Sequence, residues 1–186
     1  MPISNAQELF VHELSEIYDA EHRFVEGQQE MIEYSSDQSL KSAIQEHLAQ
    51  TRQHAVNLER VFSELGQEAQ RETNEVAQGL VSEAQEGCQE AQSDALRDAA
   101  IVSAVIKVEH FEMGSYRSLL TAARLMDQAE TERLLRENMQ QEEETARIAE
   151  SSAEELLQKA MQEQGGQQEQ EEQGLIDKAK DKLTGQ

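Results

Sequence analysis

The chain has 186 residues, one proline, no tryptophan and a formal net charge of −22. This length suits one domain of ordinary size, and such an acidic chain repels nucleic acid and anionic membranes, so we expect neither as a partner. Stretches rich in Ala, Glu, Gln, Leu and Arg favour helices, because these residues lose little side-chain freedom there. The composition therefore predicts an all-α fold.

The N-terminal segment MPISNAQELF has neither a basic region nor an apolar run, so no signal peptide is expected. No apolar stretch reaches the ~18 residues of a membrane span, and we expect a cytoplasmic protein without stable membrane insertion. Cys88 is the only cysteine, which excludes an internal disulfide. Its place on an apolar stripe indicates a small core thiol.

Apolar residues at three- and four-residue spacing predict four long helices. The first begins near the segment SNAQELF, where a capping box can start at Ser4 or at Asn5. The second follows YSSDQS, with Ser36 or Asp37 as the N-cap. Gly66 stands where a helix commonly ends with a glycine.

A shorter amphipathic helix is predicted over about residues 74–92, and two further long helices over about 94–126 and about 130–161. An up-down-up-down bundle needs only a short loop between its second and third helices, whereas here 28 residues, 66–93, lie between them. The short helix is long enough to cross most of a bundle. A long crossover of this kind predicts a ferritin-like four-helix bundle.

The chain changes character after this bundle, which we assign to residues 1–164. Residues 165–173 are rich in glutamine and glutamate without apolar periodicity, and we expect a flexible linker. Residues 174–186 carry three lysines and a small apolar stripe. They form either an amphipathic tail that docks on a partner or membrane surface, or a frayed helix.

Two carboxylates interrupt the apolar stripe of the third long helix. Glu109 and Glu112 are three residues apart and therefore share one helix face. The next hairpin turns near Gln128, and counting outward from it places Glu142 at the level of Glu112. Three carboxylates are thus expected at one depth of the second hairpin.

The first hairpin has polar seam residues at a matching depth. Counting outward from its loop places Glu21 opposite Thr51, with His47, Gln50 and His54 flanking that level. If the two hairpins pack together, the carboxylates converge with one or two histidines.

Four ionised carboxylates buried at one level would cost more than the ~5–15 kcal/mol by which a domain is stable. Protonation, or a helix rotation that exposes some groups, would compensate in part, whereas two divalent cations would balance the charge fully. Oxygen ligands with imidazole suit iron or manganese. The expected ligands are Glu21, His47, His54, Glu109, Glu112 and Glu142. The alternative is a metal-free bundle with a polar layer, acting as a structural or interaction protein.

Four segments give this chain a family resemblance: ELFVHELSEIYDAEHRF, EHLAQT, RDAAIVSAVIKVEHFEMGSY and LLRENMQQEEETA. They resemble the YciE/YciF-type ferritin-like proteins, a bacterial stress-associated family related in fold to rubrerythrin and ferritin. The resemblance covers roughly residues 4–160. It implies a ferritin-like fold, a homodimer and a dinuclear metal site, and it does not specify a reaction.

By this resemblance the family's carboxylates correspond to Glu21, Glu109, Glu112 and Glu142, and its helix-two histidine corresponds to His47.

The chain also departs from the family pattern. Many members have Glu where this chain has Gln50 and Asp where it has Ala146, and no helix-four Glu-x-x-His is present, because position 145 is Thr. One metal, or a weak site, is therefore the alternative to a complete pair. His54 offers a replacement for part of what Gln50 lacks, although His47 and His54 lie two turns apart and cannot both bind one ion.

Three functions of different classes follow. The first is a di-iron or di-manganese oxidoreductase acting on peroxide or oxygen. The second is a metal-binding or iron-handling protein without turnover, and the third is a metal-free bundle that associates through its tail. Tyr18 and Tyr116 lie within one turn of Glu21 and Glu112, so both are expected either beside the ligands or as ordinary core tyrosines.

Overall fold

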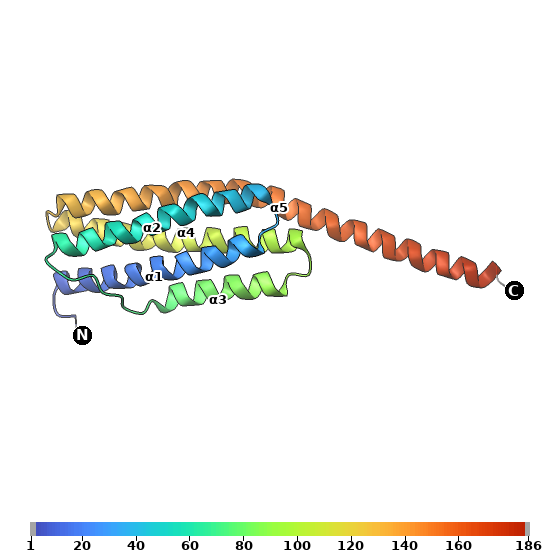
Figure 1. Cartoon of the computed structure of the whole chain (residues 1–186), viewed down its shortest axis with the longest axis horizontal. Coiled ribbons are helices and arrows are strands. Elements are labelled where there is room, and N and C mark those ends of the chain that lie inside the picture. The colour runs from blue at the N-terminus through green and yellow to red at the C-terminus, as the bar shows by residue number, and fades with distance from the viewer. Residues whose placement is uncertain (1–2, 185–186) are drawn as a thin grey trace.

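The computed structural model describes residues 3–184, and within that range it contains five helices and no strand (Figure 1). The helices are α1 (Ala6–Tyr34), α2 (Gln38–Glu64), α3 (Glu75–Glu90), α4 (Asp94–Leu125) and α5 (Ala129–Thr184). Two antiparallel hairpins, α1–α2 and α4–α5, pack as a four-helix bundle, and α3 lies against α1 and α4. The predicted all-α bundle with an extra helix in the crossover is confirmed.

The helix ends follow the expected capping chemistry. Asn5 caps α1 by accepting a hydrogen bond from the backbone N–H of Glu8, whose carboxylate in turn accepts from the backbone N–H of Ser4. Asp37 caps α2 in the same way. Gly66 follows the C-cap of α2 with a φ of +66°, a conformation that glycine adopts without steric cost.

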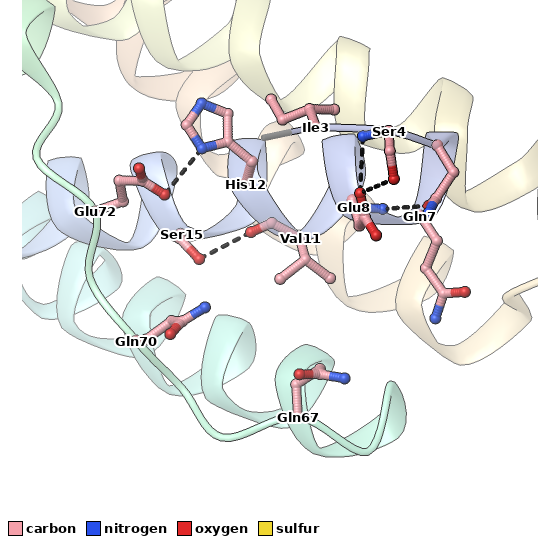
Figure 2. Close-up of a pocket in the computed structure, with 11 residues that line it drawn as sticks. Ile3, Ser4, Gln7, Glu8, Val11, His12, Ser15, Gln67, Gln70 and Glu72 are labelled. Atoms are coloured by element: carbon pink, nitrogen blue, oxygen red, sulfur yellow. Dashed lines mark hydrogen bonds and ion pairs between the residues drawn. The ribbon is translucent and has the colours of Figure 1, made fainter. Parts of the chain in front are cut away.

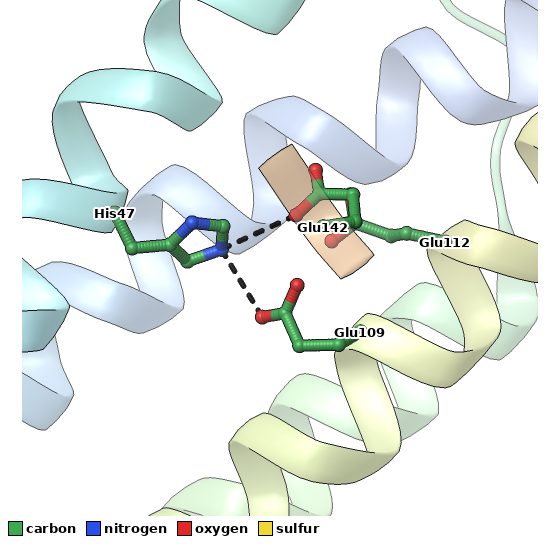
Figure 3. Close-up of side chains that lie close together, drawn as sticks. All are labelled: His47, Glu109, Glu112 and Glu142. Carbon is green, nitrogen blue, oxygen red and sulfur yellow. Dashed lines mark ion pairs between the residues drawn. The ribbon is translucent and has the colours of Figure 1, made fainter. Parts of the chain in front are cut away.

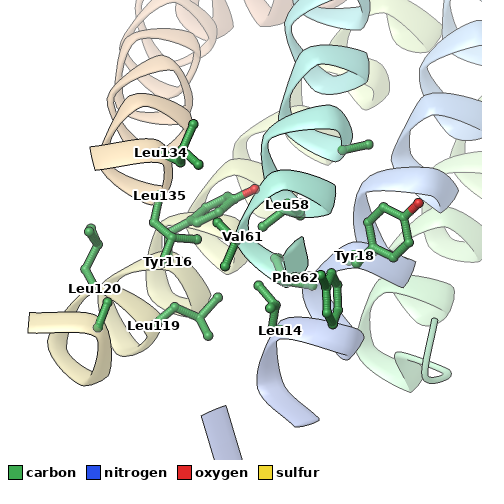
Figure 4. Packing of buried hydrophobic residues seen from close by; sticks show 14 of the residues in the cluster. Leu14, Tyr18, Leu58, Val61, Phe62, Tyr116, Leu119, Leu120, Leu134 and Leu135 are labelled. Carbon is green, nitrogen blue, oxygen red and sulfur yellow. The ribbon is translucent and has the colours of Figure 1, made fainter. Parts of the chain in front are cut away.

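The apolar core has two parts, one on each side of a polar layer. The first cluster lies toward the N-terminal end of α1, and Figure 4 shows Leu14 and Phe62 packed with residues of α4 and α5. The second cluster lies toward the α1–α2 loop, and it contains the buried thiol of Cys88, as expected. The polar layer between the clusters holds the candidate site.

A buried carboxylate ties the two hairpins together at the α1–α2 loop. Asp98, in the first turns of α4, accepts hydrogen bonds from the Ser35 hydroxyl at 3.1 Å and from the backbone N–H groups of Ser36 and Asp37, each at 2.9 Å. Its carboxylate oxygens thereby satisfy backbone donors of a loop that has no helical partners for them.

The C-terminal region, where a flexible linker was expected over residues 165–173, is helical. α5 continues through residues 165–173 and reaches Thr184, and its distal part extends beyond the bundle (Figure 1). Glutamine and glutamate are good helix formers, and no proline interrupts the segment. The segment therefore has no apolar face to bury against the bundle but can still form a helix. Among the described side chains of α5, Ala160 is the last buried one. The division at residue 164 stays a prediction.

Candidate metal centre

All six predicted ligands lie in the polar layer, and each side chain is at most 4% exposed. Four helices supply them, whereas α3 supplies none. α1 gives Glu21, α2 gives His47 and His54, α4 gives Glu109 and Glu112, and α5 gives Glu142. Each occupies a seam position of its helix, so the packing that buries the neighbouring apolar residues also buries these polar ones.

The ligand atoms form two groups that share Glu142. His47, Glu109, Glu112 and Glu142 form the first group, and each offers one atom within 4.8 Å of the others (Figure 3). His47 Nε2 lies 3.1 Å from Glu109 Oε1 and 3.6 Å from Glu142 Oε2. This group presents one imidazole nitrogen and three carboxylates to a common centre.

The second group consists of Glu21, His54 and Glu142. His54 Nδ1 lies 2.7 Å from Glu142 Oε1 and 3.6 Å from Glu21 Oε2. The two oxygens of Glu142 thus face different histidines, which is the placement of a carboxylate that bridges two ions. The structure also places His47 and His54 in separate groups, as their spacing along α2 requires.

The donor atoms of both groups fit a pair of cations. Both oxygens of Glu112 and of Glu142, together with the inward nitrogens of His47 and His54, have no hydrogen-bond partner among the described residues. Even the 2.7 Å contact between His54 and Glu142 is an ion-pair contact without hydrogen-bond geometry. Buried polar atoms are rarely left unsatisfied, and oxygen with imidazole nitrogen is a donor set for iron or manganese.

Burial controls the protonation of these groups. It raises the pKa of Glu109 and of Glu142 to about 7, and burial together with the neighbouring carboxylates raises the pKa of Glu112 well above its usual range. Burial also raises the pKa of Glu21. Burial lowers the pKa of His54, but the carboxylates of Glu21 and Glu142 outweigh that effect and raise it well above the usual value. Without cations, the layer therefore retains protons.

Outer contacts orient both imidazole rings. His54 Nε2 lies 2.7 Å from the side-chain oxygen of Gln141, and His47 Nδ1 lies 3.1 Å from the Thr145 hydroxyl and 3.3 Å from the Gln50 oxygen. When the outer nitrogen donates to these oxygens, the inner nitrogen of a neutral ring has its lone pair free for a metal ion. Gln50 thus contacts a candidate ligand instead of supplying one.

Tyr116 lies beside the site, which was one of the two positions expected for it. Its hydroxyl donates to Glu21 Oε1 and accepts from the side-chain nitrogen of Asn138 at 3.0 Å. Asn138 also accepts from Asn57 at 2.7 Å, so a buried hydrogen-bond chain runs away from the second ligand group. Asn138 is not among the residues predicted from the sequence, although its position four residues before Glu142 puts it on the same helix face.

Tyr18 does not contact a ligand. Its hydroxyl donates to Glu59 at 2.8 Å, and its ring packs edge-on against Phe62, so it is a core tyrosine. The expectation that Tyr18 could lie beside the site is wrong.

The register of the first hairpin also differs from the expectation. Glu21 faces His54 instead of Thr51, and Thr51 pairs with Gln28, whose side-chain nitrogen donates to the Thr51 hydroxyl at 3.0 Å. Helical side chains lean toward the N-terminus of their own helix. In an antiparallel pair this moves side chains of α1 away from the loop and those of α2 toward it. The contacting residue of α2 is therefore about one turn farther along than a count of Cα positions suggests.

One sizeable cavity in the described structure is remote from these ligands. It measures about 540 Å³ and lies between the start of α1 and the segment after α2, where His12 Nδ1 is 2.9 Å from a Glu72 carboxylate oxygen (Figure 2). It includes no member of either ligand group. A search for the functional site by cavity volume would therefore select a place other than the polar layer.

Comparisons with known proteins agree with this architecture. A family model described as a domain of unknown function (DUF892) matches residues 5–162. Protein YciF of Escherichia coli strain K12 is 30% identical over 143 residues, which cover 76% of this chain and 86% of that protein.

Two solved structures have the same fold. The crystal structure of the E. coli stress protein YciF gives a TM-score of 0.80 at 26% identity and covers 84% of this chain and 99% of that one. YcfI of Rhodopseudomonas palustris, for which a structural role has been suggested, gives 0.78 at 29% identity and covers 80% and 94%.

Proposed function

This chain belongs to the DUF892 family, and from its polar layer we propose that it is a stress-associated metalloprotein that holds two Fe²⁺ or Mn²⁺ ions and reduces peroxide. The first ion would take His47, Glu109, Glu112 and Glu142, and the second would take Glu21, His54 and Glu142. The observation that carries the proposal is the convergence of six donor side chains, with Glu142 shared by both groups, whose inward atoms lack hydrogen-bond partners among the described residues.

Charge balance supports the same assignment. Four carboxylates against two divalent cations leave no net charge, whereas without cations the same buried carboxylates must retain protons to avoid uncompensated charge. A bound pair of ferrous ions would supply the two electrons that, with two protons, convert hydrogen peroxide to two molecules of water, and an external reductant would have to replace these electrons for turnover. The protein's own groups hold the ions, exclude water and position Tyr116 as a hydrogen-bond donor to Glu21.

A metal-free role in association is the second candidate. The suggestion of a structural role for the R. palustris relative favours it. So do Gln50, Thr145 and Ala146, which stand where the family resemblance implies ligands or their supporting groups. The projecting part of α5 would then be the docking element.

Elemental analysis of the purified full chain separates these functions. We expect about two iron or manganese ions per chain and consumption of hydrogen peroxide by the metal-containing protein, with both lost in Glu112→Ala. One ion per chain without turnover would indicate metal handling. A chain that takes up neither metal from an excess contradicts the proposal and leaves the association role.

The other assignments stay predictions from the sequence: homodimer formation, a cytoplasmic location and the exclusion of nucleic acid. Within the described residues, no helix combines the length and apolar character that crossing a membrane requires.

A further inference from the structure

A second cavity, of about 250 Å³, lies between α2 and α5 and reaches the polar layer. His47 is part of its lining, so the cavity ends against a candidate metal ligand. Most of its wall area is apolar and comes from Leu40, Ala43, Ile44, Val105, Ile148 and Ala149. The polar residues Ser39, Gln50, Thr145 and Ser152 also line it. Such a space suits a small molecule with a hydrocarbon body.

One buried polar group on this cavity lacks a partner. Gln28 lines the cavity and is 5% exposed, and its side-chain nitrogen donates to the Thr51 hydroxyl. Thr51 donates its own proton to the backbone oxygen of His47 at 3.1 Å, so toward Gln28 it acts as an acceptor, and the amide is thereby oriented. The amide oxygen of Gln28 has no hydrogen-bond donor. A ligand with an O–H group would satisfy this oxygen.

The charges around the cavity further restrict the class of ligand that it can bind. Glu46 and Glu144 line the same cavity and are exposed, and the chain as a whole carries a formal charge of −22. These carboxylates repel an anionic ligand, such as a fatty acid, and the apolar walls disfavour burial of any charge. The ligand should therefore be neutral, with one hydrogen-bond donor and a hydrocarbon body.

We propose that this cavity binds a neutral organic hydroperoxide as a substrate of the metal centre. Its O–O bond would be reduced by two electrons and two protons to the corresponding alcohol and water, and an external reductant would replace the electrons. The hydrocarbon body lies against the apolar walls, and the hydroperoxide O–H donates to the Gln28 oxygen at the end of the cavity beside His47. Val105, in the wall, precedes Glu109 by one helix turn, so this end adjoins the first ligand group. The inference rests on the proposed function for its reaction, whereas binding itself requires no metal.

The test is binding of a redox-inert analogue to the chelator-treated full chain, followed by methyl NMR. The probe is 2-phenyl-2-propanol, the alcohol that corresponds to cumene hydroperoxide. We expect saturable shifts of the methyl signals of Ile44, Val105 and Ile148. Shifts confined to other methyl groups, or none, overturn the inference whether or not the chain binds metal.

Three variants sharpen this test. Ala43→Phe places a ring on the cavity wall and should abolish binding, whereas Ala49→Phe, at an exposed position of the same helix, should leave it unchanged. Gln28→Leu should weaken binding of the alcohol about tenfold but not that of cumene, which has no O–H. Equal effects of Gln28→Leu on both probes contradict the hydrogen bond. In metal-containing protein, Ala43→Phe should slow turnover of cumene hydroperoxide and spare that of hydrogen peroxide.

Discussion

Glu112 is the residue whose replacement best separates stability from metal binding. Neither of its oxygens has a hydrogen-bond partner, and burial together with Glu142, Glu21 and Glu109 raises its pKa well above the usual range. Without metal this buried side chain lowers the stability of the folded protein, whether it is protonated or ionised. With metal it becomes a ligand.

We predict that Glu112→Leu raises the melting temperature of the metal-free protein, because leucine adds buried apolar area worth ~1.5–3 kcal/mol when fully packed. With excess Fe²⁺ or Mn²⁺ the order should reverse, since the parent gains ~2.7 kcal/mol at a free metal concentration of a hundred times Kd. Four melting curves, parent and variant with chelator and with metal, measure this. Glu86→Leu, at an exposed position of α3, is the control and should change neither curve much. A variant that melts lower in both conditions would make Glu112 a structural polar group.

The pH dependence of the metal-free protein follows from the same layer. Burial raises the pKa of Glu109 and Glu142 to about 7, so each binds its proton more tightly in the folded state than in the unfolded one, where the pKa is 4.5. Stability should therefore fall as the pH rises from about 4.5 through about 7, by up to ~1.4 kcal/mol per pH unit for each proton. The raised pKa of His54 acts in the same direction, because its stabilising proton is also lost at high pH.

Urea unfolding in chelator between about pH 5 and about pH 8 measures this slope. In Glu109→Gln one titrating group is absent, so the decline should be shallower than in the parent. Equal slopes would mean that the general self-repulsion of this acidic chain, and not the polar layer, sets the pH dependence.

At the scale of helices, the sequence predicted what periodicity and capping control. The long apolar stripes predicted all four bundle helices. Asn5 and Asp37, each one of two expected N-caps, begin α1 and α2, and Gly66 follows the end of α2 as expected. The depth of the ligands could be predicted because helix rise is constant. The side-chain contacts of the first hairpin could not be predicted, because a count of Cα positions ignores the direction in which helical side chains lean. The continuation of α5 was missed because a pattern without apolar periodicity predicts no burial, yet permits a helix.

Truncation tests whether the projecting part of α5 contributes to the bundle. A chain ending at Gln164 should keep the melting temperature and metal content of the full chain, because it retains Ala160, the last buried one among the described side chains of α5. A chain ending at Ala153 should melt several degrees lower, since it lacks Leu156 and Ala160, which are 5% and 1% exposed. A similar loss in the longer chain would show that apolar residues of 174–186 pack on the bundle.

For the whole molecule, the two ligand groups connect the hairpins. Their residues come from α1, α2, α4 and α5, and Glu142 belongs to both groups. Metal bound there would link four helices through one centre, whereas α3, which supplies none of these residues, would keep its packing on α1 and α4 either way.

Hydrogen exchange measures this difference. Metal should slow the exchange of backbone amides near the ligands in all four bundle helices and leave α3 almost unchanged, because opening any ligand-bearing helix must break metal bonds. The Glu112→Leu variant with metal is the matched control. Protection limited to one hairpin would contradict a centre shared between the two.

The contact of Asp98 with the α1–α2 loop bears on the order in which the chain can fold during synthesis. The donors it accepts from belong to Ser35, Ser36 and Asp37, more than 60 residues earlier in the chain. While the ribosome has released only the first hairpin, this loop has water in place of its native acceptor. The turn is completed only after the crossover helix and the start of α4 have emerged. The first hairpin therefore lacks this stabilising contact until the start of α4 is present, and the same helix then brings Glu109 and Glu112 to complete the polar layer.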